Sequence, residues 1–334
     1  MALDVLAIGD IATDTFIRLK DASVTCDSRH EHCLLCMRFG AKIPYESVAV
    51  VCGTGNAANA AVACATLGLT VAMASHVGDD DLGRTNIETL RARGIDTSLV
   101  VREAGKTSNH SFVLWFEDER TILVKHEEFS YRFIQPHTPP QWIYFSSVGK
   151  NSDTYHREIE EYLSAHPSIR LAFQPGTCQL SMGKNALINL YKRANIVFCN
   201  KQEAQTILET NEQSMAILLR DMRALGAKIV VITDALEGVS AADETTSFSI
   251  PAFMMPKPAV QRTGAGDALA STTMAYLSFD LSLEESLMRG AINAASVAHG
   301  IGAQANLLTR DEIEQWYMHR PAHFVANPLT LPRA

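Results

Sequence analysis

The sequence lacks several features that mark specialised classes of protein. It has no run of 18 or more apolar residues, so no helix is expected to span a membrane. It also has no basic block, and its 29 lysines and arginines are outnumbered by 37 aspartates and glutamates, giving a formal charge of −8. Proteins that bind polyanions usually show the opposite sign, so we expect no nucleic-acid partner. Because the N-terminus lacks a basic leader, we expect a cytoplasmic protein without a signal peptide.

Cysteine is also sparse, and the seven residues are odd in number and scattered along the chain. This favours free thiols in a reducing compartment over a disulfide framework. One local cluster, His30, His32, Cys33 and Cys36, has a spacing found in metal sites. A second Cys/His pair is missing, and a strand would alternate these side chains between its two faces. Free thiols are therefore the expectation, with zinc as the alternative.

What the sequence does contain is an alternation of short apolar runs with helical segments, in a composition that is 47% apolar and 20% charged. Strands are predicted at 3–8, 71–75, 98–102, 142–146, 169–173, 196–199 and 229–233. Helices are predicted at 81–93, 153–165, 184–193, 201–223, 266–278, 283–299 and 309–318, and an alanine-rich helix ends at Leu67. The pattern predicts βαβ units in a doubly wound α/β fold, with a mostly parallel sheet between two helical layers. With no linker visible, residues 1–334 are expected to form one domain.

Two stretches break this alternation. Residues 15–51 contain short strand-like pieces with no helix between them, and a predicted hairpin joins 111–116 to 121–126. We expect the segments at about 15–50 and 107–125 to form a small second sheet outside the main one.

The turn at Thr263-Gly264-Ala265-Gly266-Asp267 precedes a run of good helix formers. Small residues at a helix start leave backbone N–H groups and the positive end of the helix dipole open to an anion, phosphate above all. An aspartate is out of place beside a phosphate unless it acts as a base toward an incoming hydroxyl. The alternative is an ordinary helix start in which Asp267 caps the helix or interacts favourably with the helix dipole.

Other polar residues follow predicted strands or open helices. Gly55 and Asn59 begin the alanine-rich helix, where glycine allows close approach and asparagine offers both donors and acceptors. Asn200 and Glu203 lie one helical turn apart, a spacing suited to hydrated Mg²⁺ or phosphate. Thr233 to Gly238 has the residues of a nucleotide-proximal loop. Each of the last two could also be an ordinary helix cap or turn.

Two aspartates follow the first predicted strand, at the sheet edge where ligands of open α/β folds gather. For Asp10 we expect a solvated loop acid, and Asp14 is the candidate for binding.

These motifs, in this order, resemble the PfkB/ribokinase family of carbohydrate kinases over nearly the whole chain. Thr263 to Asp267 is similar to the family's second signature, and Thr54 to Asn59 to its first, with Thr54 in place of the usual glycine. Asn200 and Glu203 match the family's N-x-x-E motif. Thr233 to Gly238 matches its T-x-G-x-x-G loop, with Ala235 in place of a glycine.

The resemblance implies a ribokinase-like kinase domain, with ATP and Mg²⁺ required and the small sheet acting as a lid. Asp267 would be the catalytic base, and the amides of Gly264, Ala265 and Gly266 the anion hole. The roles implied for other residues are sugar binding for Asp14, Gly55 and Asn59; ATP binding for Asn200, Thr233 and Gly238; and metal binding for Glu203. Lid sheets of this kind often form a homodimer contact.

One departure from the family pattern concerns a monovalent cation. Many relatives have Asp-Thr-Thr before the glycine, and that aspartate helps to bind the cation near the anion hole. This chain has Gln261-Arg262-Thr263, which puts K⁺ activation in doubt, and Arg262 is either a substitute charge or a solvated loop residue.

The substrate implied by Asp14 and Asn59 is an unphosphorylated sugar or a nucleoside. A phosphosugar would need a basic cluster, and nothing in the sequence brings its candidates together: Arg18, Lys42, Arg120 and Lys125. The alternatives are a phosphosugar kinase and a catalytically silent sugar-binding regulatory protein with the same fold.

Overall fold

The computed structural model describes residues 2–27, 33–117, 119–256, 259–261 and 263–332. His30, His32 and Arg262, which the sequence singled out, lie outside the described residues. Within the described helices, none combines the length and apolar character that a membrane span requires. The cytoplasmic location stays a prediction.

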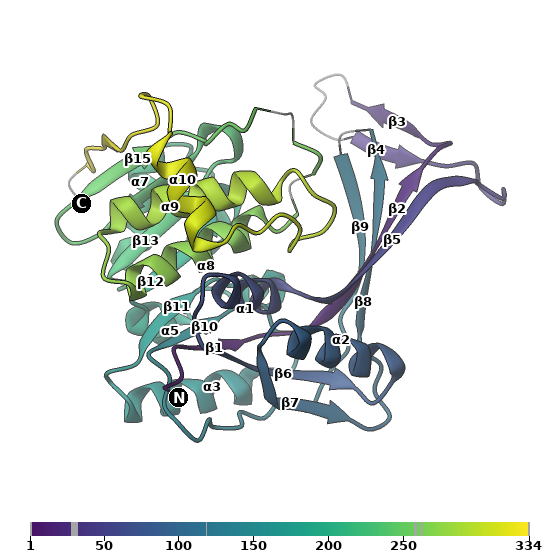
Figure 1. Ribbon diagram of the computed structural model, residues 1–334, viewed down its shortest axis with the longest axis horizontal. Helices are drawn as coiled ribbons and strands as arrows, with labels where there is room; N and C mark the ends of the chain where they lie inside the picture. Colours follow the sequence, from purple (N-terminus) through teal and green to yellow (C-terminus); the bar gives the residue numbers. More distant parts are fainter. Residues whose placement is uncertain (1, 28–32, 118, 257–258, 262, 333–334) are drawn as a thin grey trace.

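A ten-stranded sheet runs through the molecule in the order β16-β15-β14-β13-β12-β11-β10-β1-β6-β7 (Figure 1). All seven predicted strands are present and run parallel: β1 (Val5–Ile8), β6 (Val71–Gly78), β7 (Asp96–Glu103), β10 (Trp142–Phe145), β11 (Arg170–Phe173), β12 (Ile196–Asn200) and β13 (Ile229–Thr233). Three antiparallel strands that the sequence pattern did not reveal extend one edge: β14 (Val239–Ala242), β15 (Ser247–Ile250) and β16 (Asn327–Pro328).

Helices cover both faces of this sheet, as predicted. One face shares a hydrophobic core with α1 (Asn56–Thr66), α2 (Asp81–Ala92), α8 (Ala265–Ser278), α9 (Leu283–Val297) and α10 (Arg310–Met318). The other face packs against α3 (Asp153–Ala165), α4 (Thr177–Met182), α5 (Ile188–Arg193), α6 (Lys201–Leu208) and α7 (Met215–Ala224). In β1, Val5 and Ala7 face the first core while Leu6 and Ile8 face the second. The strand is therefore apolar throughout because it is buried on both sides.

The single helix predicted at 201–223 is wrong, because the chain breaks it into α6 and α7. Glu209 ends α6 in a left-handed conformation, with φ 56°. The Gln205 side chain then donates to the Glu212 backbone carbonyl at 2.7 Å and holds the loop that precedes α7. The helix predicted at 184–193 is likewise shorter, since α5 begins only at Ile188.

A separate four-stranded sheet projects from the main body (Figure 1), in the order β5-β2-β8-β9. Its strands are β2 (Ala12–Leu19), β5 (Tyr45–Thr54), β8 (Asn109–Phe116) and β9 (Glu119–Lys125). The predicted hairpin is present as the antiparallel pair β8–β9. Strand β2 pairs with β8 in parallel and with β5 in antiparallel orientation, so the two predicted excursions form one sheet.

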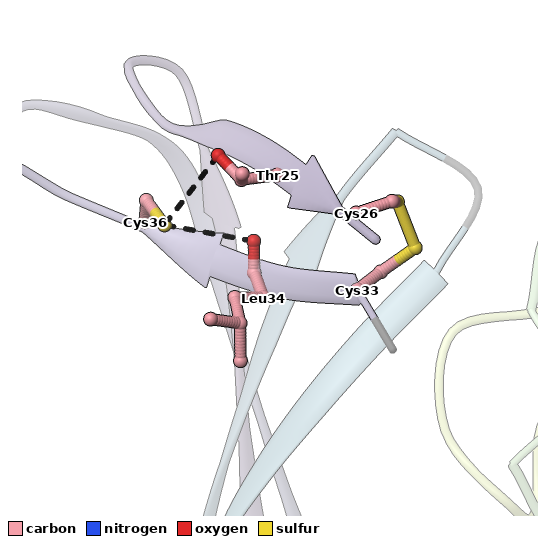
Figure 2. Close-up of a disulfide and its surroundings, with 5 residues drawn as sticks. All are labelled: Thr25, Cys26, Cys33, Leu34 and Cys36. Atoms are coloured by element: carbon pink, nitrogen blue, oxygen red, sulfur yellow. Dashed lines mark hydrogen bonds between the residues drawn. A yellow bond between two sulfur atoms is a disulfide. The ribbon is translucent and has the colours of Figure 1, made fainter. Parts of the chain in front are cut away.

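The expectation of free thiols is wrong for Cys26 and Cys33, which form a disulfide (Figure 2). The hairpin of β3 (Ser23–Cys26) and β4 (Cys33–Cys36) sets these two residues directly opposite each other. A spacing of seven residues does not reveal that register. Cys36 remains free, and its thiol lies 3.7 Å from the Leu34 carbonyl oxygen. With its sulfur in the disulfide, Cys33 is not a thiolate ligand for zinc.

Candidate active site

Asp267 lies at the third position of helix α8, buried with only 6% of its surface exposed. Three side-chain amides donate to its carboxylate. Asn56 Nδ2 and Gln174 Nε2 reach Oδ1 at 2.9 and 3.1 Å, and Asn59 Nδ2 reaches Oδ2 at 2.8 Å. Burial raises the pKa of Asp267 from 3.8 to about 6, and the amide bonds offset part of that effect. The result is a positioned carboxylate that gains and loses a proton close to neutral pH.

The turn before Asp267 contains two glycines, and their surroundings differ. Gly264 caps α8 with φ 82°, and a Cβ there would lie 2.4 Å from Ala303 Cα, so only glycine fits. At Gly266, by contrast, a Cβ would meet no heavy atom within 4 Å. Thr263 Oγ1 is buried and has no hydrogen-bond partner among the described residues. The turn is thus packed on one side and open on the other.

The open side of the turn faces a cavity of about 850 Å³. Ala265 and Gly266 line it, together with three other residues singled out in the sequence: Asn200, Thr233 and Gly238. Apolar side chains such as Phe253 and Leu269 form much of the remaining wall. This combination of apolar walls, a few polar groups and a helix N-terminus is typical of a site for a large phosphorylated ligand.

Asn200 and Glu203 form a capping box at the start of α6. Glu203 Oε2 accepts from the Asn200 backbone N–H at 2.8 Å, and Asn200 Oδ1 accepts from the Glu203 N–H at 2.9 Å. The ordinary helix-cap interpretation therefore holds for these atoms. Burial raises the pKa of Glu203, and the charge of Glu203 in turn raises the pKa of Asp267.

The loop from Thr233 to Gly238 lies at the carboxyl end of β13, beside the same cavity. Asp234 Oδ2 accepts from Lys201 Nζ at 3.1 Å, and both residues line the cavity. This ion pair links the Thr233–Gly238 loop to the start of α6, 33 positions earlier in the sequence.

The residues expected at the sugar are not among those that line this cavity. Asn59 donates to Asp267 and accepts from Gln304 Nε2 at 3.1 Å, so the protein already uses both ends of its amide. Gly55 precedes α1 and packs against the Asp10 backbone carbonyl. Asp14 lies on β2 of the small sheet, and burial raises its pKa, an effect partly offset by the Thr54 and Ser111 hydroxyls. Asn59 therefore contacts Asp267 directly. Asp14 belongs instead to the small sheet.

The sequence profile of the pfkB family of carbohydrate kinases matches residues 46–310. The chain belongs to this family. Members of the PfkB family are ATP-dependent phosphotransferases, and the chain is an ATP-dependent kinase.

This PfkB-family kinase is 25% identical over 319 residues to the bifunctional protein HldE of Campylobacter fetus, covering 90% of this chain. The chain spans 64% of the length of that relative. Among solved structures it is similar to the nucleoside kinase of Methanocaldococcus jannaschii, with a TM-score of 0.79, 18% identity, and coverage of 95% and 98% of the two chains. The ribokinase of Arabidopsis thaliana complexed with ribose and ATP gives a TM-score of 0.78 at 15% identity, with coverage of 94% and 98%. These likenesses establish the ribokinase fold.

The interpretation of Asp10 as a solvated loop acid is wrong for this PfkB-family kinase. Asp10 is 5% exposed, and its carboxylate accepts from the Tyr131 hydroxyl at 2.8 Å. His126 Nδ1 lies 4.0 Å from the same carboxylate. Burial raises the pKa of Asp10 to about 7, partly offset by the bond from Tyr131. Because Tyr131 is 121 positions away, the composition around Asp10 did not reveal this environment.

Sequence reasoning also missed three residues that hold the site together: Asn56, Gln174 and Gln304. Asn56 is the first residue of α1, directly after the cap Gly55, and its side chain contacts Asp267, 211 positions away. Gln174 directly follows β11 and donates to Asp267. A polar residue at the carboxyl end of a predicted strand is the sequence signal that could have identified it. Gln304 lies in the loop after α9 and carried no recognisable signal.

Proposed function

We propose that this kinase transfers the γ-phosphoryl group of ATP to a hydroxyl of an unphosphorylated sugar or nucleoside, with Asp267 as general base. The observation that carries the proposal is the position of Asp267. It stands one residue after the open Gly266, at the helix end that faces a cavity of about 850 Å³. Its pKa of about 6 suits a base that works near neutral pH.

The roles of the surrounding groups follow from charge. The N–H groups of Gly264, Ala265 and Gly266 are at the positive end of α8, where they stabilise negative charge on the transferring phosphoryl group. One carboxylate oxygen of Asp267 accepts the proton from the substrate hydroxyl. The amides of Asn59 and Gln174 keep the carboxylate from turning away. Phosphoryl transfer needs this positioning more than it needs covalent chemistry.

We further propose that Asn200, Thr233 and Gly238 contact ATP and that Glu203 serves Mg²⁺. The residues present fit a magnesium ion, since Mg²⁺ is usually held by one or two carboxylates, with water and phosphate completing its shell. When bound, Mg²⁺ would neutralise charge that develops on the phosphates. Glu203 uses Oε2 in its capping box, so Oε1 is the carboxylate oxygen that remains for this role.

The small sheet is proposed to act as a lid that brings Asp14 over the substrate and excludes water. Asp14 and Phe16 share one face of β2, and Phe16 and Val51 approach Gly302 in the loop after α9. Arg18 and Arg120 flank Trp115 on this face, but Arg18 is four residues beyond Asp14, about 13 Å along the strand. It also pairs with Glu46 at 3.0 Å. This arrangement favours an unphosphorylated substrate.

A coupled assay of ADP release tests the proposal over ribose, fructose, nucleosides, ketodeoxy sugar acids and phosphosugars. We expect turnover with at least one unphosphorylated sugar or nucleoside, at a kcat/KM at least about tenfold above that of the corresponding phosphosugar. No turnover across the panel, with sugar binding still measurable by calorimetry, would instead support the silent binding protein.

The outer face of the small sheet is proposed as a homodimer contact. Register places Val48, Val50, Phe112 and Leu123 on that face, with 51%, 59%, 38% and 53% of their surfaces exposed. The solvent-exposed face of a sheet is usually polar, and an exposed apolar face marks an interaction surface.

Substituting Val50→Lys should therefore convert a dimer into a monomer of 36.6 kDa in sedimentation velocity. Ile122→Lys provides the matched control, because Ile122 is 41% exposed on the opposite face of the same sheet. A wild-type chain that sediments as a monomer at micromolar concentration would rule the contact out.

A further inference from the structure

Gln261 stands just before the anion-hole turn, at the position of the aspartate that, by the family resemblance, helps to bind a monovalent cation nearby. Gln261 is 8% exposed, and its Oε1 accepts from the Thr263 backbone N–H at 2.7 Å. Its Nε2 donates to the Gly300 carbonyl at 3.0 Å and approaches the Thr263 carbonyl at 3.4 Å. One carboxamide thus satisfies groups from two separate loops.

The orientation of this carboxamide is fixed by its partners. Thr263 N–H can only donate, and the Thr263 and Gly300 carbonyls can only accept. If oxygen and nitrogen were exchanged, a donor would face a donor and an acceptor would face two acceptors. The NH₂ group therefore points at the two carbonyl oxygens.

Converging backbone carbonyls are also the ligands that hold monovalent cations in proteins. An aspartate would add a negative acceptor beside them and complete a set of oxygens around a cation. Glutamine does the reverse, because its NH₂ group supplies the donors that the carbonyls need. With the Gln261 nitrogen 3.0 Å from the Gly300 oxygen and 3.4 Å from the Thr263 oxygen, a hydrogen-bond donor takes the space beside both carbonyls that a cation would need. The residues present therefore do not fit the cation.

The backbone around Gln261 is tied to the same loop. The N–H groups of Val260 and Gln261 both donate to the Ala298 carbonyl, at 2.8 and 3.0 Å. Gly264 then packs directly against Ala303. The turn that starts α8 is thus connected to the loop after α9 by backbone bonds, by packing and by the Gln261 side chain.

We infer that the Gln261 carboxamide replaces the monovalent cation, so that the anion-hole turn is held in place without K⁺ or Na⁺. Gln261 is a positioning residue: it acts on the geometry of Gly264 to Gly266 and touches no reacting atom. The inference rests on the proposed function for its effect on turnover, but the geometry that it concerns is independent of any substrate.

The test compares the wild type with Gln261→Asp in KCl and in N-methylglucamine chloride at equal ionic strength. Aspartate is one methylene shorter, which leaves about 1.5 Å more room beside the two carbonyls. Gln315→Asp on the exposed surface of α10 is the matched control for the change of charge.

For the wild type and Gln315→Asp, we expect the melting temperature and the rate of ADP release to be the same in the two salts. For Gln261→Asp, we expect K⁺ to raise the melting temperature, as a ligand of the folded state does, and to raise the rate by about 5–150-fold. Potassium would then restore the stability and the turnover that the loss of the Gln261 carboxamide removed.

Two results would overturn the inference. One is a wild-type protein whose melting temperature or turnover is higher in K⁺ than in N-methylglucamine. That result would overturn the inference even if the variant does not fold. The other is a folded Gln261→Asp variant that ignores K⁺ in both measurements. If no substrate gives turnover in any variant, the proposed function fails, while the melting temperatures still decide the role of Gln261.

Discussion

Replacing Asp267 with asparagine should lower kcat for phosphoryl transfer by about 10²–10⁴-fold, the usual contribution of a positioned general base. The asparagine has nearly the same shape but cannot take a proton from the substrate hydroxyl. The cavity and the amides of the turn are left in place, so KM for ATP should change little. The assay is ADP release with the substrate that the screen identifies.

Stability should survive this substitution. Because the pKa of Asp267 is raised to about 6, the folded state binds its proton more tightly than the unfolded state. Between the unfolded value of 3.8 and about 6, rising pH therefore lowers the free energy of unfolding, and the ionised group is a liability at neutral pH. Against that relief, the new amide faces the Asn59 donor, an unmade bond that costs about 1–3 kcal/mol. We expect a change in melting temperature of about 5 °C at most.

The pH dependence of the wild type gives a second view of the same residue. A base must be ionised, so kcat/KM should fall about tenfold per pH unit below its pKa of about 6 and level off above it. Asp10, with a pKa of about 7, is a second buried carboxylate that could produce an acid limb. In Asp10→Asn the limb near pH 6 should persist, and its disappearance would assign the limb to Asp10.

Asp280→Asn is the matched control for the loss of one carboxylate. Asp280 is an exposed residue just beyond the other end of α8, with φ 62°, a conformation that asparagine adopts readily. Turnover should stay at the wild-type level. A wild-type rate in Asp267→Asn would show that the base assignment is wrong.

Substitution of Gly266 by leucine should lower kcat/KM for ATP by about 10²–10³-fold, comparable to the loss of an anion-hole donor. Since a Cβ at this position meets nothing within 4 Å, the added side chain enters the cavity where the phosphates are proposed to lie. The fold should tolerate it, because most residues form helix better than glycine, alanine by about 1 kcal/mol. Gly266→Ala should show an intermediate loss, and calorimetry should report weaker ATP binding in the same order.

Gly264→Ala is the contrasting control two residues earlier. Its φ of 82° and the closeness of Ala303 predict a loss of stability instead, at least the roughly 1–2 kcal/mol that a left-handed residue costs. The melting temperature should fall for Gly264→Ala and hold for Gly266→Leu. Full ATP affinity in Gly266→Leu would mean that the phosphates do not approach this turn.

The site was predictable as a set of motifs, and much less as a set of contacts. The turn before α8, the Asn200 pair and the Thr233 loop each carried a local signal, because small residues and polar residues after apolar runs mark strand ends. Parallel strands then bring those ends to one edge of the sheet, which is why Asn200, Thr233, Gly238 and Gly266 line one cavity. Asn59, for which a sugar contact stays a prediction, also donates to Asp267, and its place in the sequence did not indicate that contact.

The sequence by itself determined the alternation of strands and helices, the small second sheet, and the order of motifs that marks the family. These depend on periodicity and on backbone freedom, which neighbouring residues decide. The tertiary structure alone decided which side chains meet. The partners of Asp267 are 211, 208 and 93 positions away. The Cys26–Cys33 disulfide, the burial of Asp10 and the carboxamide of Gln261 are contacts of the same kind. Each of these contacts depends on strand register or on the packing of two loops. The spacing of residues along the chain does not indicate either of these.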